Sequence, residues 1–172
     1  MYEQKKACCF FGHRRVENIE SLRSKVYKTV EELILNHGVE TFLFGSKSEF
    51  DYLCRSVVAD LKEKFPHIKR VYVRAEYMEI SENYEKYLLE DFEETYFPKR
   101  AVNSGKAVYL ERNYEMIDKS DFCIVYLSED YLPPERKQCK KDLFSYQPNS
   151  GTKLAFNYAV KKNRKLINIA EI

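Results

Sequence analysis

The sequence is poor in the patterns that would mark several common protein classes. It has five cysteines, an odd number, and no Cys-x-x-Cys pair, so we predict neither a disulfide framework nor a metal cluster. No apolar run approaches the roughly 18 residues that a membrane span needs. The opening residues, MYEQKK, lack the apolar core of a signal peptide. We therefore expect a cytoplasmic protein with reduced thiols and no membrane partner.

An excess of charge of one sign is also missing. Lysine and arginine number 29 and aspartate and glutamate 27, and a net charge of +2 is too even to indicate a nucleic-acid partner. Hydrophobic residues make up 44% and charged residues 33%, which is typical of a folded soluble protein. The length of 172 residues suits one domain with a sizeable core, and we expect residues 1–172 to form it.

Short apolar runs alternate along the chain with longer amphipathic segments. The short runs are typical of buried strands and the longer segments of helices. This alternation predicts an α/β fold, a three-layer Rossmann-like sandwich with a parallel five-stranded sheet. The predicted strands are Ala7–Phe11, Val39–Phe44, Ile68–Val73, Asp121–Leu127 and Leu166–Ile169.

Fold rules suggest the strand order 3-2-1-4-5, in which the order reverses between the first and fourth strands. Ligands of such sheets bind at that reversal, beyond the carboxyl ends of the strands. The segments Tyr96–Gly105 and Leu127–Asn149 are predicted loops, and the length of the second is typical of a functional lid. The predicted helices run from Asn18 or Ser21 to Asn36, from the turn Ser46–Asp51 to Leu61 or beyond, over Ser81–Glu94, over Ala107–Lys119, and from Ser150 to about Lys162.

Three of the five glycines fall at predicted strand-to-helix turns, at Gly12, Gly45 and Gly151. All three turns should lie at one edge of the sheet, and each offers an anion backbone N–H groups and the positive end of a helix. Such turns also favour glycine for their geometry alone, and none of them is a P-loop or a complete Gly-x-Gly-x-x-Gly motif. The combination of the three predicts a pocket for a phosphorylated or nucleotide-like molecule.

Polar side chains beside these turns are candidates for ligand contacts. His13 could act as a general acid or base, or equally as a hydrogen-bonded turn residue. Arg112, followed by Asn113, could grip a phosphate bidentately, or it could pair with a neighbouring glutamate on the surface. Asp51 has the position of a structural carboxylate near a helix start, where an acid is favoured.

Four segments together resemble a known protein family. They read CFFGHRR, FGSKSEFD, ERNYEMIDKSDFCIVYL and SGTKLAFNYAVKKNRKLINI, in this order along the chain. The set resembles the SLOG superfamily, the Rossmann-like group that includes the Smf/DprA proteins, the LOG enzymes and the YpsA-like proteins. It is most similar to small stand-alone YpsA-like members from bacteria or phages.

The resemblance implies a site for a nucleotide or a nucleotide-derived signal at the glycine turns. Glu49 stands where many relatives have a small residue, and beside a ribose it could bind hydroxyls or serve as a base. By position, the other residues implied for the pocket are Gly12, His13, Arg14, Gly45, Ser46, Asp51, Arg112, Asn113, Ser150, Gly151 and Thr152.

The same resemblance raises the question of catalysis. LOG enzymes cleave the N-glycosidic bond of nucleoside 5′-monophosphates with an arginine and with a glutamate in a PGGxGTxxE motif. Arg112 matches the arginine, but Gly151-Thr152 is followed by Lys153-Leu154-Ala155, without the glutamate, and Pro148-Asn149-Ser150 replaces PGG. Because a glycosidase needs a carboxylate near the sugar, we expect binding without turnover.

Three alternatives stay open at this point. The first is an N-glycosidase that uses Glu49, Asp51 or His13 in place of the missing glutamate. The second is a DprA-like single-stranded DNA binder, which would need a basic groove lined with aromatic rings. The third is a pure interaction module with a vestigial pocket. We expect no cofactor and no metal, and the sequence allows a homo-oligomer.

Overall fold

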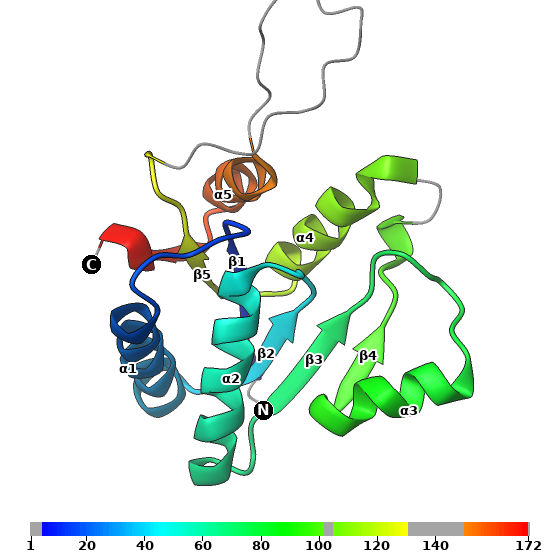
Figure 1. Ribbon diagram of the computed structural model, residues 1–172, viewed down its shortest axis with the longest axis horizontal. Coiled ribbons are helices and arrows are strands. Elements are labelled where there is room, and N and C mark those ends of the chain that lie inside the picture. The colour runs from blue at the N-terminus through cyan, green and yellow to red at the C-terminus, as the bar shows by residue number, and fades with distance from the viewer. Residues whose placement is uncertain (1–4, 102–104, 131–149, 172) are drawn as a thin grey trace, which may run out of the picture.

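An open sheet of six parallel strands forms the centre of the molecule, in the order β4-β3-β2-β1-β5-β6 (Figure 1). The computed structural model describes residues 5–101, 105–130 and 150–171. The strands are β1 (Lys6–Gly12), β2 (Val39–Phe44), β3 (Lys69–Val73), β4 (Glu94–Tyr96), β5 (Phe122–Tyr126) and β6 (Lys165–Asn168).

Strand β1 lies between β2 and β5, and the order of the sheet reverses there. Cys8 of β1 is in register with Phe42 of β2 on one side and with Phe122 of β5 on the other. The five strands expected from the sequence are β1, β2, β3, β5 and β6, and their relative order is the predicted one. The prediction of an α/β fold with a parallel sheet is confirmed.

The prediction of five strands is wrong, because the sheet has a sixth strand at its edge. Strand β4 pairs in parallel with Val71–Val73 of β3. The sequence pattern had assigned Glu94 to a helix end and Tyr96 to a loop, but α3 ends at Asp91. Phe92, directly after the helix, is buried in the core and turns the chain toward the sheet. A strand of three residues, two of them polar, carries no apolar run that sequence reasoning could detect.

Helices cover both faces of the sheet, which gives the three layers that the sequence predicted (Figure 1). Helices α1 and α2 pack on one face and α4 and α5 on the other, while α3 lies against β4 at the edge. The helices are α1 (Ile19–His37), α2 (Glu49–Lys64), α3 (Glu82–Asp91), α4 (Val108–Asp118) and α5 (Gly151–Lys161), with short 3-10 turns at Lys99–Ala101, Gly105–Ala107 and Ile169–Glu171.

Serine side chains begin three of the helices. The hydroxyl oxygens of Ser48, Ser81 and Ser150 each accept a hydrogen bond from a backbone N–H in the first turn of α2, α3 and α5. These bonds satisfy N–H groups that have no partner within the helix. Helix α1 ends at Gly38, whose φ of 67° is the left-handed conformation that a helix C-cap glycine adopts. Local sequence therefore fixes where these helices begin and end.

The alternating side chains of β1 divide the core into two clusters. Cys8 and Phe10 face α1 and α2, whereas Cys9 and Phe11 face α4 and α5. The cysteines of the described ranges are free and buried, as expected for reduced thiols. Among the described residues, no helix has the length and apolar character needed to span a membrane. The predicted lid Leu127–Asn149 lies outside the described residues from position 131 onward.

Candidate functional site

The strands end at one edge of the sheet, which we call the C-terminal edge, and the predicted turns leave from it. We call residues 12–16, which begin at the last residue of β1, the β1 turn, and residues 45–48, which follow β2, the β2 turn. The β1 turn and the segment after β5 leave the sheet at the point where the strand order reverses. In open parallel sheets this crevice is the usual ligand position.

The β1 turn is held by apolar packing and by hydrogen bonds. A Cβ atom on Gly12 would lie 2.5 Å from Cδ1 of Phe50, so the turn accommodates the Phe50 ring only because residue 12 is glycine. The His13 side chain is buried, and its Nε2 accepts a hydrogen bond from the Ser128 backbone N–H at 3.0 Å. His13 N–H donates to the Tyr126 carbonyl at 3.2 Å. His13 thus ties the end of β1 to the end of β5.

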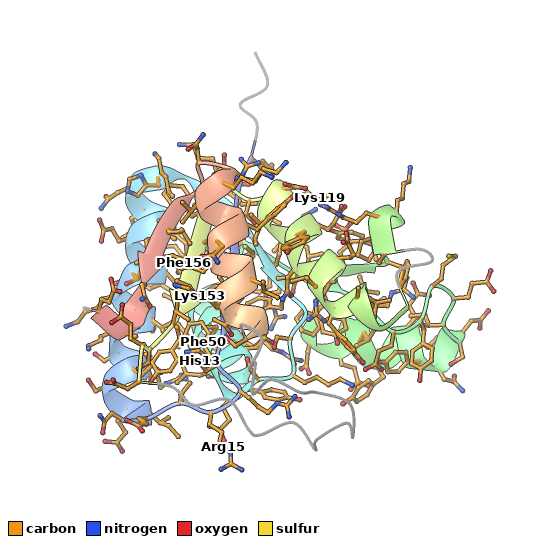
Figure 2. All side chains as sticks on the ribbon, turned by 90° about the horizontal axis from the view of Figure 1, so that it is seen from above. His13, Arg15, Phe50, Lys119, Lys153 and Phe156 are labelled. Atoms are coloured by element: carbon orange, nitrogen blue, oxygen red, sulfur yellow. The ribbon has the colours of Figure 1, made fainter. Side chains whose placement is uncertain are left out.

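Burial also decides the chemical state of His13. Desolvation lowers the pKa of His13 below its ordinary value, and the Ser128 carbonyl only partly offsets this effect. The ring is therefore neutral at pH 7. Figure 2 shows His13 and Phe50 at the end of the sheet where α5 begins with Lys153 in its first turn, whereas Arg15 points away from the molecule.

Glu49 belongs to the hydrogen bonding of the β1 turn. Its Oε2 accepts a hydrogen bond from the Val16 backbone N–H at 2.9 Å, and its own N–H donates to the Arg14 carbonyl at 2.9 Å. The Arg14 side chain is exposed. Glu49 therefore holds the β1 turn against the start of α2.

The β2 turn is built around a buried arginine. The Arg112 side chain, from α4, is 5% exposed, and its Nη1 donates to the Gly45 carbonyl. A Cβ atom on Gly45 would lie 2.5 Å from Cδ of Arg112 and 2.8 Å from the Val73 carbonyl oxygen, so the arginine occupies the space that a side chain would need. Asn113 accepts a hydrogen bond from Arg112 Nε at 3.2 Å. The structure thus brings Gly45, Arg112 and Asn113 into one cluster.

Asp51 is the second buried ionisable side chain near this turn. Its side chain is fully buried in the first turn of α2, and neither carboxylate oxygen has a hydrogen-bond partner of normal geometry among the described residues. Desolvation raises the pKa of Asp51 to about 7. The positive charges of Arg55 and Arg112 and the backbone amides of Gly45 and Ser46 act in the opposite direction.

Arg112 shows the complementary effect. Burial lowers the pKa of its guanidinium, and the Asp51 carboxylate is the strongest influence that opposes this. The carboxylate of Asp51 and the guanidinium of Arg112 therefore oppose, in part, the effect of burial on each other's pKa. Buried ionisable groups are expensive to maintain, and strongly perturbed ones are concentrated at functional sites.

Three residues that the sequence did not indicate lie on the solvent side of Arg112. Glu76, in the segment after β3, accepts hydrogen bonds from the Tyr109 hydroxyl at 2.7 Å and from Lys47 Nζ at 3.3 Å. We call Lys47, Glu76 and Tyr109 the outer trio. Sequence reasoning followed glycines at strand ends, and the segment after β3 has none. A search for polar residues after every predicted strand would have found Glu76.

The start of α5 is less constrained than the other two turns. Ser150 Oγ accepts a hydrogen bond from the Lys153 N–H at 3.2 Å, Gly151 is exposed and Thr152 is half-buried. A Cβ atom on Gly151 would meet none of the described residues within 4 Å. Glycine at this position is therefore not demanded by space, in contrast to Gly12 and Gly45.

Two further features of the described residues bear on function. A separate, largely apolar cavity of about 370 Å³ lies between the starts of α1 and α2 and includes Glu49 on its wall. No group of three or more histidine, cysteine, aspartate or glutamate side chains in the described ranges is arranged to hold a metal ion. Comparison with protein-family models gives no match to this chain, and comparison with curated proteins gives none either.

Proposed function

We propose that the protein binds a nucleotide or a nucleotide-derived small molecule at the C-terminal edge of the sheet, with the phosphate beside the β2 turn. The observation that carries this proposal is the burial of two ionisable side chains at the β2 turn, Arg112 against the Gly45 carbonyl and Asp51 in the first turn of α2. Hydrophobic residues of similar size would fill that space at less cost to the stability of the fold. A function at the turn accounts for the charges.

The position of Arg112 and Asp51 in the fold favours a ligand that carries a phosphate. The β2 turn is next to the strand-order reversal, where open parallel sheets bind their ligands. Arginine presents a planar set of donors that matches phosphate oxygens. The resemblance of the sequence to the SLOG superfamily implies the same class of ligand at the same turns.

Binding without turnover agrees better with the side chains than catalysis does. His13 accepts a hydrogen bond from Ser128, Glu49 holds the Val16 N–H, and Asp51 is fully buried. A general acid or base must reach the proton that it transfers. A pKa of about 7 would suit Asp51 for such chemistry, but its burial separates it from a substrate.

A thermal-shift screen tests the proposal. The purified protein is heated with mononucleotides, cyclic dinucleotides, NAD and ADP-ribose, and a ligand at a hundred times its Kd should add about 2.7 kcal/mol to the free energy of unfolding. We expect at least one of these compounds to raise the Tm, and we expect the shift to disappear in Arg112→Met.

Arg70→Met is the matched control, because Arg70 lies near the start of β3 and pairs with Glu93 away from the β2 turn. It should keep the ligand-induced shift relative to its own unliganded Tm. Absence of a shift with every compound, or equal loss in both variants, would contradict the proposal.

A further inference from the structure

The outer trio joins three separate elements above the buried Arg112. Lys47 comes from the β2 turn, Glu76 from the segment after β3, and Tyr109 from the first turn of α4. The Arg112 guanidinium carbon lies 5.8 Å from the centre of the Tyr109 ring, so the tyrosine is in contact with both the arginine below and the glutamate above. Tyr109 therefore links the buried guanidinium to the Glu76 and Lys47 side chains.

Two side chains of the outer trio donate hydrogen bonds to the third, the carboxylate of Glu76. The Tyr109 hydroxyl and Lys47 donate hydrogen bonds to Glu76, and the charges of Lys47 and Arg112 add to their effect. Together they lower the pKa of Glu76 below its ordinary value. A phenol and an ammonium that donate to one position, with the positive charge of a guanidinium nearby, are a favourable setting for an oxyanion.

We propose that the Glu76 carboxylate holds the place of the ligand's phosphoryl group, which displaces it and takes over the hydrogen bonds of Lys47 and Tyr109 beside the positive charge of Arg112. The inference rests on the proposed function and adds to it the position of the phosphate and an internal competitor. Glu76 would then compete with any anion that enters and lower its apparent affinity. Anions of low charge would not displace Glu76.

The geometry allows the exchange. The side chain of Glu76 is 35% exposed and that of Lys47 is 66% exposed, so the ion pair between them is open to water. Exposed ion pairs of this kind contribute little to stability. Glu76 also lies outside the regular elements, between β3 and α3, where a side chain can turn away without breaking a helix or strand.

Glu76→Gln tests the inference, because it keeps the size of the side chain and removes its charge. Glu79→Gln is the matched control: Glu79 is exposed in the same segment, and the substitution changes the net charge of the protein equally. The probe is inorganic pyrophosphate, titrated calorimetrically at low ionic strength, with circular dichroism to confirm that each variant is folded. We expect Glu76→Gln to bind pyrophosphate about fivefold more tightly than Glu79→Gln, and Lys47→Met to bind it more weakly than the wild type.

A parallel titration with AMP separates this inference from the proposed function. Tighter pyrophosphate binding in Glu76→Gln, with no binding of the compounds of the thermal-shift screen to any variant, would support the oxyanion position and overturn the nucleotide ligand. If AMP binding is lost in Arg112→Met, but Glu76→Gln and Glu79→Gln bind pyrophosphate with equal affinity, the inference is overturned and the proposed function stands. No pyrophosphate binding to any variant would also overturn the inference.

Discussion

The β1 turn and the β2 turn leave the same edge of the sheet, and both require glycine, but they are built on opposite principles. At the β1 turn the glycine makes room for an aromatic ring, and a buried neutral histidine and the exposed Glu49 carboxylate accept hydrogen bonds from backbone N–H groups. At the β2 turn the glycine makes room for a buried arginine, and a buried carboxylate lies beside it. In the β1 turn the glycine serves apolar packing. In the β2 turn it accommodates an ionisable side chain that apolar packing would not require.

This comparison shows that a glycine at the end of a strand indicates close approach but not its purpose. What separates the two turns is the chemistry of the group that approaches. The structural role of the β1 turn and the ligand role proposed for the β2 turn lead to different responses to mutation and to pH.

The largest expected effect is at Asp51. Its pKa in the folded protein is about 7, against 3.8 for a free side chain. Between pH 3.8 and pH 7 the folded state therefore keeps a proton on Asp51 that the unfolded state has released. Stability from this site is therefore highest below pH 4 and falls as the pH rises to 7. The advantage of Asp51→Asn over the wild type should grow by on the order of 4 kcal/mol between pH 4 and pH 8.

Urea unfolding at a series of pH values measures this difference. Asp91→Asn, an exposed site at the end of α3, serves as the control and should show no such trend. A constant difference between Asp51→Asn and the wild type across the range would show that Asp51 is not a buried titrating carboxylate.

Gly45→Ala should have the next largest effect. The new Cβ would press on Arg112 and on the backbone carbonyl of Val73, and backbone cannot turn aside as a side chain can. Overpacking of this kind costs about 1–3 kcal/mol in the free energy of unfolding. Gly151→Ala, where the added methyl meets no atom of the described residues, should change stability by no more than about 0.5 kcal/mol. Equal losses in the two variants would mean that Arg112 does not fill the β2 turn.

His13→Ala should cost about 1–2 kcal/mol, because the Ser128 N–H loses its acceptor. The pH dependence should run opposite to that of Asp51. The pKa of His13 is lowered in the folded state, so its contribution is present above pH 6.5 and is lost as the pH falls. His67→Ala, at an exposed site, is the control. A His13 contribution that grows on acidification would contradict the neutral, buried ring.

Glu49→Gln should have the smallest effect. The amide oxygen of glutamine can still accept a hydrogen bond from the Val16 N–H. We therefore expect the free energy of unfolding to fall by about 0.5 kcal/mol relative to the control Glu63→Gln, on the exposed face of α2. Denaturant midpoints measure both. A loss of several kcal/mol would give Glu49 a role that the hydrogen bond to Val16 does not explain.

Sequence reasoning reached the sheet and its strand order because buried parallel strands appear as apolar runs. It missed β4 because an edge strand of three residues shows no such run. It selected both Arg112 and Asp51 as candidate pocket residues, but it did not predict that both side chains are buried. The burial of Arg112 depends on the contact of α4 with the β2 turn, in which Arg112 meets Gly45, 67 positions earlier in the chain. Lys47, Glu76 and Tyr109 went unnoticed because only the fold brings them together.

The most direct test of the account is amide chemical-shift mapping by NMR while AMP or ADP-ribose is added. We predict that the largest changes fall on Gly45, Ser46 and Lys47, with smaller changes at Gly12 and His13. Changes confined to the cavity between α1 and α2, at Val16, Tyr52 and Ser56, would place the ligand elsewhere and contradict the role given to the β2 turn.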